Sequence, residues 1–179
     1  MSDNRMNFTI ENNSQFPFVE IALDKGEKAY IQRGGMVYHS PSVKLNTKLN
    51  AKGSGLGKLV KAVGRSMVSG ESTFITEATS EVDGGVLALA PNVPGQVMAL
   101  EIGDHQYRLN DGAFLALDGS AFYTMERQSF GRALFGGQGG FFVMTTEGEG
   151  TLLVNAFGAI KKIELQDQEM TIDNAHVVA

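Results

Sequence analysis

An internal repeat is the feature of this sequence that most restricts its fold. Residues 64–74 match residues 131–141 without a gap, and both segments begin with Gly-Arg and end with Phe. An acidic residue and a glycine then precede an apolar run in both copies, within residues 83–88 and 149–154. Because repeated units bury their apolar faces against one another, the chain is expected to be modular.

A second short unit recurs three times, as Gly34–Tyr38, Gly112–Ala116 and Asn174–Val178. Each copy follows a Leu-centred apolar stretch, the last of which is Ile163–Leu165. The leading residue is Gly, Gly and then Asn, and these are the residues that most readily adopt a positive φ. The pattern predicts a left-handed turn before an apolar strand in all three copies.

The local patterns inside the repeats are mostly those of strands. Segments Phe18–Leu23, Gln96–Ile102 and Gln106–Leu109 alternate or are rich in β-forming residues, and turn residues bound them. Pro91 and Pro94-Gly95 divide the long apolar stretch 85–100 into two strands and a turn. Short strands at such regular spacing favour a sandwich or a barrel.

Two segments show helical signals. Apolar residues recur at helical spacing over Leu56–Val68, and a second helical turn is predicted over Gln128–Phe135. Each segment comes just before a glycine-rich part of the repeat. We expect them to be short crossovers that cap the ends of a β-structure.

These patterns predict an all-β protein. The expected architecture is a double-stranded β-helix or a jelly-roll-like sandwich of pseudo-repeated modules with one or two short helices. A chain of 179 residues buries roughly 70% of its unfolded surface, which suits one core. We therefore predict a single β domain, residues 1–179, with internal repeats at about 64–116 and 131–179.

The charge is distributed unevenly. Residues 28–70 carry eight basic and no acidic side chains, whereas the remainder carries seven basic and all twenty acidic ones. The basic segment 28–65 can bind an anionic partner or membrane surface, meet the acidic surface of a second copy, or form a solvated edge. Nucleic acid is not expected, because the whole chain is acidic. The candidate anion or partner surface consists of Lys58, Lys61 and Arg65.

The glycine-rich parts of the repeat are interpreted as tight structural corners. The run Gly136–Gly140 lacks the Gly-Lys-Ser/Thr ending of a phosphate-binding loop, and an apolar strand pattern follows it. The acidic Glu147 and Glu149 lie near such a corner and are interpreted as turn-stabilising residues, with acid–base catalysis as the alternative. The predicted corner residues are Gly70, Glu71, Gly137 and Gln138.

The remaining patterns speak against an enzyme. The absence of cysteine excludes cysteine-ligated metal centres and thiol nucleophiles, and no Gly-x-Ser-x-Gly motif occurs. The histidines His39, His105 and His176 are isolated, without the His-x-His spacing of a cupin metal site. We predict no catalytic residue, no metal and no cofactor, and keep a cupin-like enzyme as a third hypothesis.

Several of these motifs, in this order, resemble the mitochondrial biogenesis family named for altered inheritance of mitochondria protein 24. The resemblance implies a fold similar to the trp RNA-binding attenuation protein, assembly into rings or other homo-oligomers, and a scaffolding role. Family members continue beyond the segment that ends this chain at Ala179, and an unpaired sheet edge left there would favour oligomerisation. The motifs are Gly34–Tyr38, Ser69–Phe74, Pro94–Gly95, Gly112–Ala116, Gly148–Thr151 and Asp173–Ala179.

Together these observations favour a non-enzymatic scaffold or interaction protein that assembles as a homo-oligomer. The alternative is a ring-like protein that binds a small ligand or RNA. The amino terminus has no apolar signal region, and no stretch of 18 apolar residues occurs in the chain, so we expect a cytoplasmic protein.

Overall fold

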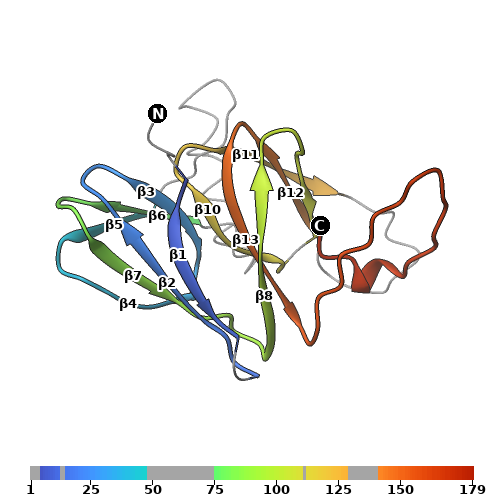
Figure 1. Cartoon of the computed structure of the whole chain (residues 1–179), viewed down its shortest axis with the longest axis horizontal. Coiled ribbons are helices and arrows are strands. Elements are labelled where there is room, and N and C mark those ends of the chain that lie inside the picture. Colours follow the sequence, from blue (N-terminus) through green and yellow to red (C-terminus); the bar gives the residue numbers. More distant parts are fainter. Residues whose placement is uncertain (1–4, 13–14, 48–74, 111, 129–140) are drawn as a thin grey trace.

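In the computed structural model, nearly all the regular structure is β-strand (Figure 1). The structure describes residues 5–12, 15–47, 75–110, 112–128 and 141–179. These residues form thirteen strands and one 3-10 turn, η1. Their bounds are β1 Asn7–Glu11, β2 Phe18–Leu23, β3 Lys28–Gln32, β4 Met36–His39, β5 Val43–Thr47, β6 Ile75–Ser80, β7 Gly85–Leu89, β8 Gly95–Ile102, β9 Arg108–Leu109, β10 Phe114–Asp118, β11 Phe122–Gln128, β12 Phe141–Glu147, β13 Gly150–Phe157 and η1 Asn174–His176.

The strands form three antiparallel sheets. Their orders are β1-β2-β7-β4, β5-β6-β3-β10-β13-β8 and β11-β12-β9. The six-stranded sheet lies in the middle, because its two faces contribute to two different core clusters. The predicted all-β, sandwich-like class is therefore confirmed.

The strand pairing itself repeats. In the first unit, residues 18–89, β7 pairs with β2 and β4, while β6 pairs with β3 and β5. In the second unit, residues 95–157, β13 pairs with β8 and β10, while β12 pairs with β9 and β11. The two units thus have the same connectivity. The turns matched in the sequence, at residues 83–88 and 149–154, occupy equivalent places, although the predicted repeats at about 64–116 and 131–179 begin partway through these units.

The pairing of β3 with β10 joins the two units into one continuous sheet. Along β10, Leu115 and Ala116 belong to one core cluster, whereas Phe114 and Leu117 belong to the other. Every residue of β10 is buried for this reason. A strand covered on both faces has no polar alternation, so burial rather than period-two patterning determines its sequence.

Two of the three predicted left-handed turns are confirmed. Gly34 and Gly112 have φ values of 82° and 80°, and each precedes an apolar strand, β4 or β10. A side chain at such a φ is unfavourable, which explains why glycine occupies both positions. The strands predicted over Phe18–Leu23 and Gln96–Ile102 correspond to β2 and β8, and Gln106–Leu109 contains the shorter β9.

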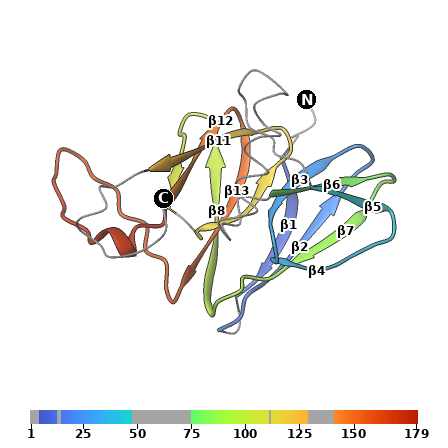
Figure 2. The ribbon, with the colours of Figure 1, turned by 180° about the vertical axis from the view of Figure 1, so that it is seen from behind.

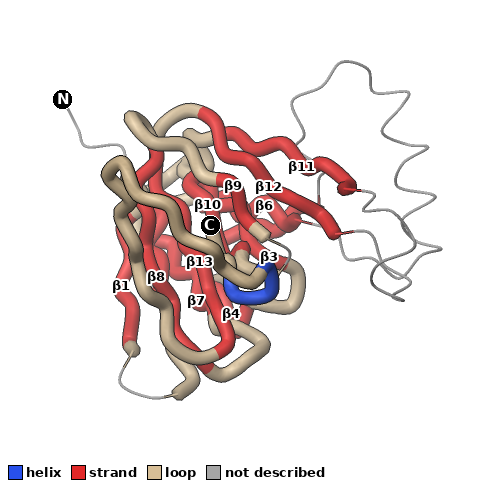
Figure 3. Tube along the Cα trace, turned by 90° about the vertical axis from the view of Figure 1, so that its right-hand side faces the viewer, coloured by secondary structure: helices blue, strands red, loops and turns tan. Residues whose placement is uncertain are grey.

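The third copy of the turn-and-strand unit was predicted wrongly. Asn174 begins η1, the only helical segment of the described chain (Figure 3), and neither Ile163–Leu165 nor Asn174–Val178 forms a strand. The Asp173 carboxylate accepts a hydrogen bond from the Ala175 N–H at 3.0 Å, and this contact stabilises the 3-10 turn in place of the left-handed one. Residues 163–165 pair with no described strand.

The end of the chain nevertheless lies at an equivalent position in the repeat. The carbonyl of Val178 accepts a hydrogen bond from the Asn110 N–H at 3.1 Å, and the Val177 carbonyl accepts one from the Asn110 side chain at 2.9 Å. Asn110 directly follows β9, so residues 177–178 lie beside the end of β9. In the first unit β3 corresponds to β9, and β10 lies beside β3 in the same way. The third copy therefore occupies its repeat position without forming strand geometry.

The two predicted helices cannot be compared fully with the structure. Leu56–Val68 and residues 129–135 lie outside the described residues, while Gln128 ends β11 instead of beginning a helix. No helix in the described part of the chain is both long and apolar enough to cross a bilayer.

Candidate functional site

The residues singled out as candidate sites lie outside the described part of the chain. They are the surface residues Lys58, Lys61 and Arg65 and the corner residues Gly70, Glu71, Gly137 and Gln138. Their roles stay predictions. The described surfaces that can carry a function are the start of the basic segment, one pocket, the edge of β4 and the carboxyl-terminal tail.

The start of the basic segment is less positive in the fold than in the sequence. The Lys28 ammonium lies 3.6 Å from the Glu77 carboxylate, and that of Lys44 lies 3.4 Å from Glu81. Both acidic residues come from β6 or the turn that follows it, and β6 is the strand between β3 and β5. Strand pairing therefore partly neutralises a segment that has no acidic residue of its own.

The three histidines do not converge on a metal site. His39 ends β4, His105 lies between β8 and β9, and His176 ends η1. His39 Nδ1 lies 2.9 Å from the carbonyl oxygen of Ser40, within hydrogen-bonding distance. Among the described residues, no three His, Asp or Glu side chains lie close enough together to hold a metal ion.

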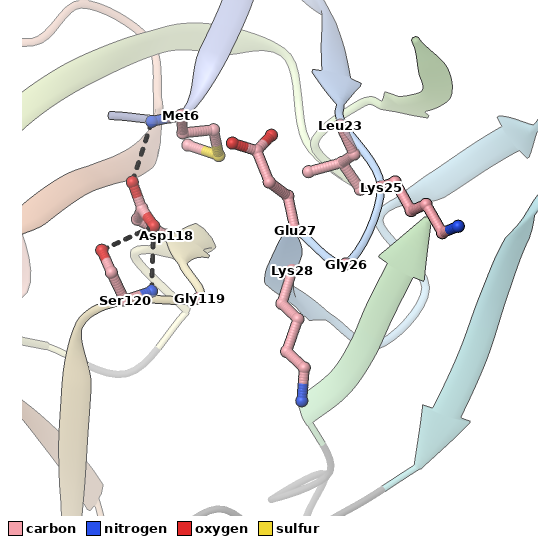
Figure 4. A pocket seen from close by; sticks show the side chains of 9 residues that line it. All are labelled: Met6, Leu23, Lys25, Gly26, Glu27, Lys28, Asp118, Gly119 and Ser120. Carbon is pink, nitrogen blue, oxygen red and sulfur yellow. Dashed lines mark hydrogen bonds between the residues drawn. The ribbon is translucent and has the colours of Figure 1, made fainter. Parts of the chain in front are cut away.

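A pocket of about 410 Å³ lies between the β2–β3 turn and the β10–β11 turn (Figure 4). Its volume falls within the range of small-molecule sites. The amino groups of Lys25 and Lys28 point outward, whereas the Glu27 carboxyl group points toward Met6. The lining residues are Met6, Leu23, Lys25, Gly26, Glu27, Lys28, Asp118, Gly119 and Ser120.

The carboxylates of this pocket already serve the backbone. Asp118 accepts hydrogen bonds from the Met6 N–H at 2.8 Å, the Ser120 N–H at 2.9 Å and the Ser120 hydroxyl at 2.8 Å. Glu27 accepts one from the Asp24 N–H at 2.8 Å. These contacts give both residues a structural role in turns, which is the usual role of Asp before Gly-Ser. The sequence analysis missed Asp118, although the Asp-Gly-Ser turn was a signal for it.

The edge of β4 is the most apolar exposed strand surface of the first unit. Within the described chain, β4 pairs with β7 alone, and Met36, Val37 and Tyr38 are all exposed. The Tyr38 ring lies 5.9 Å from that of Phe18, and its hydroxyl donates to Glu20 at 2.8 Å. These contacts hold the tyrosine on β4, whose outer edge pairs with none of the described strands.

The hydrogen bond with Glu20 raises the pKa of Tyr38 above its ordinary value of 10.0, because proton loss would place a phenolate beside the carboxylate. We expect Glu20→Gln to lower that pKa and Glu11→Gln, which removes only a weaker charge effect, to lower it less. The pKa is measured by ultraviolet titration. The titration of the Tyr38→Phe variant is subtracted, so that only the signal of Tyr38 remains. Equal shifts in the two variants would show that the hydrogen bond is not the main cause.

A family model described as Mitochondrial biogenesis AIM24 matches residues 8–179, nearly the whole chain. The chain belongs to the AIM24 family. The expected family is thus confirmed, whereas the similarity to the trp RNA-binding attenuation protein stays a prediction.

Two streptococcal proteins are similar to this AIM24 member. This chain is 72% identical over 179 residues to uncharacterized protein M6_Spy0233 of Streptococcus pyogenes serotype M6. The aligned region covers 100% of this chain and 72% of that protein. The crystal structure of protein SPYM3_0169 from Streptococcus pyogenes superposes on this chain with a TM-score of 0.79, and the two sequences are 66% identical. The match covers 97% of this chain and 75% of the other chain. The AIM24 fold described here is therefore shared with a solved relative.

The tail of this AIM24 chain, residues 161–173, is exposed at every position. Lys162 and Glu164 form an ion pair at 2.7 Å, and this hydrogen bond raises the pKa of Lys162 and lowers that of Glu164. The tail also exposes large apolar side chains in two pairs, and within each pair one residue separates the two members. They are Ile163, Leu165, Met170 and Ile172.

Proposed function

We propose that this AIM24 chain is a non-enzymatic scaffold or interaction protein that assembles with copies of itself. The observation that carries the proposal is the outer edge of β4, which no other described strand pairs with and where Met36, Val37 and Tyr38 are exposed side by side. An exposed apolar edge strand pairs readily with another strand, and natural proteins normally protect it with charge, proline or a covering segment. An exposed apolar edge strand such as β4 is therefore suited to assembly.

The environment of the carboxylates in the pocket supports a role other than catalysis. Asp118 and Glu27 accept hydrogen bonds from backbone N–H groups, which supports a structural role for both carboxylates. We further propose that the protein works in the cytoplasm. Its partners would be other copies of the chain and, through the basic segment 28–65, an anionic molecule or surface. A ring that binds a small ligand or RNA is the alternative.

The mass of the purified protein in solution, measured by light scattering at low and high salt, tests the proposal. We expect an oligomer at both salt concentrations, because apolar strand pairing depends little on screening. A mass of 19.2 kDa, that of one chain, across all protein concentrations would contradict self-assembly. RNA binding that weakens steeply with salt would favour the alternative.

A further inference from the structure

We propose that the outer face of the sheet β1-β2-β7-β4 binds arginine side chains on an extended segment of a partner protein. The inference rests on the interaction role in the proposed function and names a class of partner for it. We name the binding surface the outer-face patch, and it consists of Glu11, Phe18, Glu20 and Tyr38. The four strands of this sheet lie next to one another in Figure 1 and in the reverse view of Figure 2.

The first part of the outer-face patch is a row of paired residues across three strands. Ala88 of β7 pairs with Glu20 of β2 on one side and with Tyr38 of β4 on the other. The preceding residue, Leu87, belongs to the core cluster, so Ala88 and its two partners point to the opposite, outer face. The Tyr38 hydroxyl reaches across Ala88 and donates to Glu20 at 2.8 Å. The ring therefore lies along the sheet and covers Ala88, which is 0% exposed, while Tyr38 itself is 46% exposed.

The second part of the outer-face patch is the pair of Glu11 and Phe18. These two residues are direct partners in the β1–β2 register, and Phe18 lies two residues before Glu20, so all three share one face. The Phe18 ring centre lies 5.9 Å from that of Tyr38. Glu11 and Glu20 are diagonal neighbours, and such positions are about 7–8 Å apart. Two aromatic rings and two carboxylates thus lie together on one surface.

The charge of the outer-face patch favours a cation. The strands β1, β2, β7 and β4 contain two acidic residues, Glu11 and Glu20, and no Lys or Arg. Within the described chain, the Glu11 carboxylate has no hydrogen-bond or ion-pair partner, and the Glu20 carboxylate has the Tyr38 hydroxyl alone. The hydrogen bond with Glu20 is the main cause of the raised pKa of Tyr38, and the charge of Glu11 raises that pKa further. The negative field of both carboxylates therefore reaches the tyrosine.

Arginine fits this surface better than lysine. Its planar guanidinium stacks on an aromatic ring and donates two parallel hydrogen bonds to a carboxylate, whereas the lysine ammonium is a compact, strongly hydrated charge. The Glu20 carboxylate lies at the hydroxyl end of the Tyr38 ring, so one guanidinium can contact both. Glu11 can take a second arginine. Side chains on one face of an extended segment are about 7 Å apart, close to the spacing of the two carboxylates, so the partner segment carries arginine at alternate positions.

A pair of labelled peptides tests this preference. Both carry fluorescein at the amino end, one with the sequence Gly-Arg-Gly-Arg-Gly and the other with lysine in place of arginine. Fluorescence anisotropy at low salt measures the dissociation constant of each peptide for the whole chain. We expect the lysine peptide to bind at least about threefold more weakly, because the two peptides have equal charge and only the guanidinium stacks on the ring.

Two substitutions each remove one part of the outer-face patch. Tyr38→Leu removes the aromatic ring and keeps both carboxylates, whereas Glu20→Gln keeps the ring and removes a charge. We expect each to weaken binding of the arginine peptide about two- to fivefold, and Tyr38→Leu also to abolish the difference between the two peptides. Phe157→Leu and Asp104→Asn are the matched controls, because they remove an exposed ring and an exposed carboxylate outside the patch and should leave the dissociation constant unchanged. Circular dichroism verifies that each variant keeps the fold.

The outcomes separate this inference from the proposed self-assembly. If the arginine and lysine peptides bind equally, or if Tyr38→Leu leaves their binding unchanged, charge alone attracts them and the inference is wrong. Binding that the controls weaken as much as the patch variants do also overturns it. The mass in solution tests self-assembly independently. An oligomer that does not bind the arginine peptide contradicts only this inference, and a monomer that binds it through the patch contradicts only self-assembly.

Discussion

Replacing Leu153 by alanine is expected to lower the free energy of unfolding by about 3–4 kcal/mol and the melting temperature by roughly 6–16 °C. Leu153 is 0% exposed, and on β13 it pairs with Ala99 of β8 and Ala116 of β10. The small side chains of its paired residues cannot fill the space that the truncation leaves. The cost therefore includes a cavity as well as the lost burial.

Urea unfolding followed by circular dichroism measures this effect. Leu153→Met keeps the volume and is expected to cost less than about 1.5 kcal/mol, whereas Val93→Ala, at an exposed position, is expected to change the stability by less than about 0.5 kcal/mol. A loss below about 1 kcal/mol for Leu153→Ala would mean that Leu153 does not pack between the sheets as described.

The second large effect is expected for Asp118→Ala, which should cost about 3 kcal/mol. Asp118 is 6% exposed and accepts three hydrogen bonds, from the Met6 N–H and from the N–H and hydroxyl of Ser120. Its removal leaves the N–H of Met6, a buried residue, without an acceptor. Because Met6 directly precedes β1, the loss should spread to the pairing of β1 with β2.

Hydrogen exchange locates this second effect. We expect the amides of β1 to exchange faster in Asp118→Ala, while those of β13 stay protected until global unfolding. Asp104→Ala, at an exposed loop position, is the control and should leave exchange and stability unchanged. Uniformly faster exchange in all strands would show that Asp118 supports the whole fold and not β1 in particular.

The fold class could be predicted because turn chemistry and repeats are local signals. Gly34 and Gly112 indicated left-handed turns from residue type alone, and the acidic-Gly turns before β7 and β13 indicated equivalent units. The sheet orders could not be predicted, because the pairing of β3 with β10 joins residues far apart in the sequence. Asn174 was misjudged because the neighbouring Asp173 carboxylate favours a 3-10 turn.

The candidate surfaces were harder to predict than the fold. A count along the chain marked the basic segment, yet Glu77 and Glu81 reach two of its lysines only after β6 has paired with β3 and β5. The edge of β4 became visible only when the sheet order placed that strand at the end of its sheet. Exposure of an apolar segment such as β4 depends on its neighbours, which the sequence alone does not identify.

The sharing of one core between the two units also affects the order of folding during synthesis. The cluster that holds Val19, Ile21 and Leu87 of the first unit is completed by Leu115 and Leu153 of the second. A ribosome that has made only the first unit therefore carries a chain whose apolar face is still open. Stable folding of the first unit therefore has to wait until β13 emerges, and the open apolar face exposes the nascent chain to aggregation for that time.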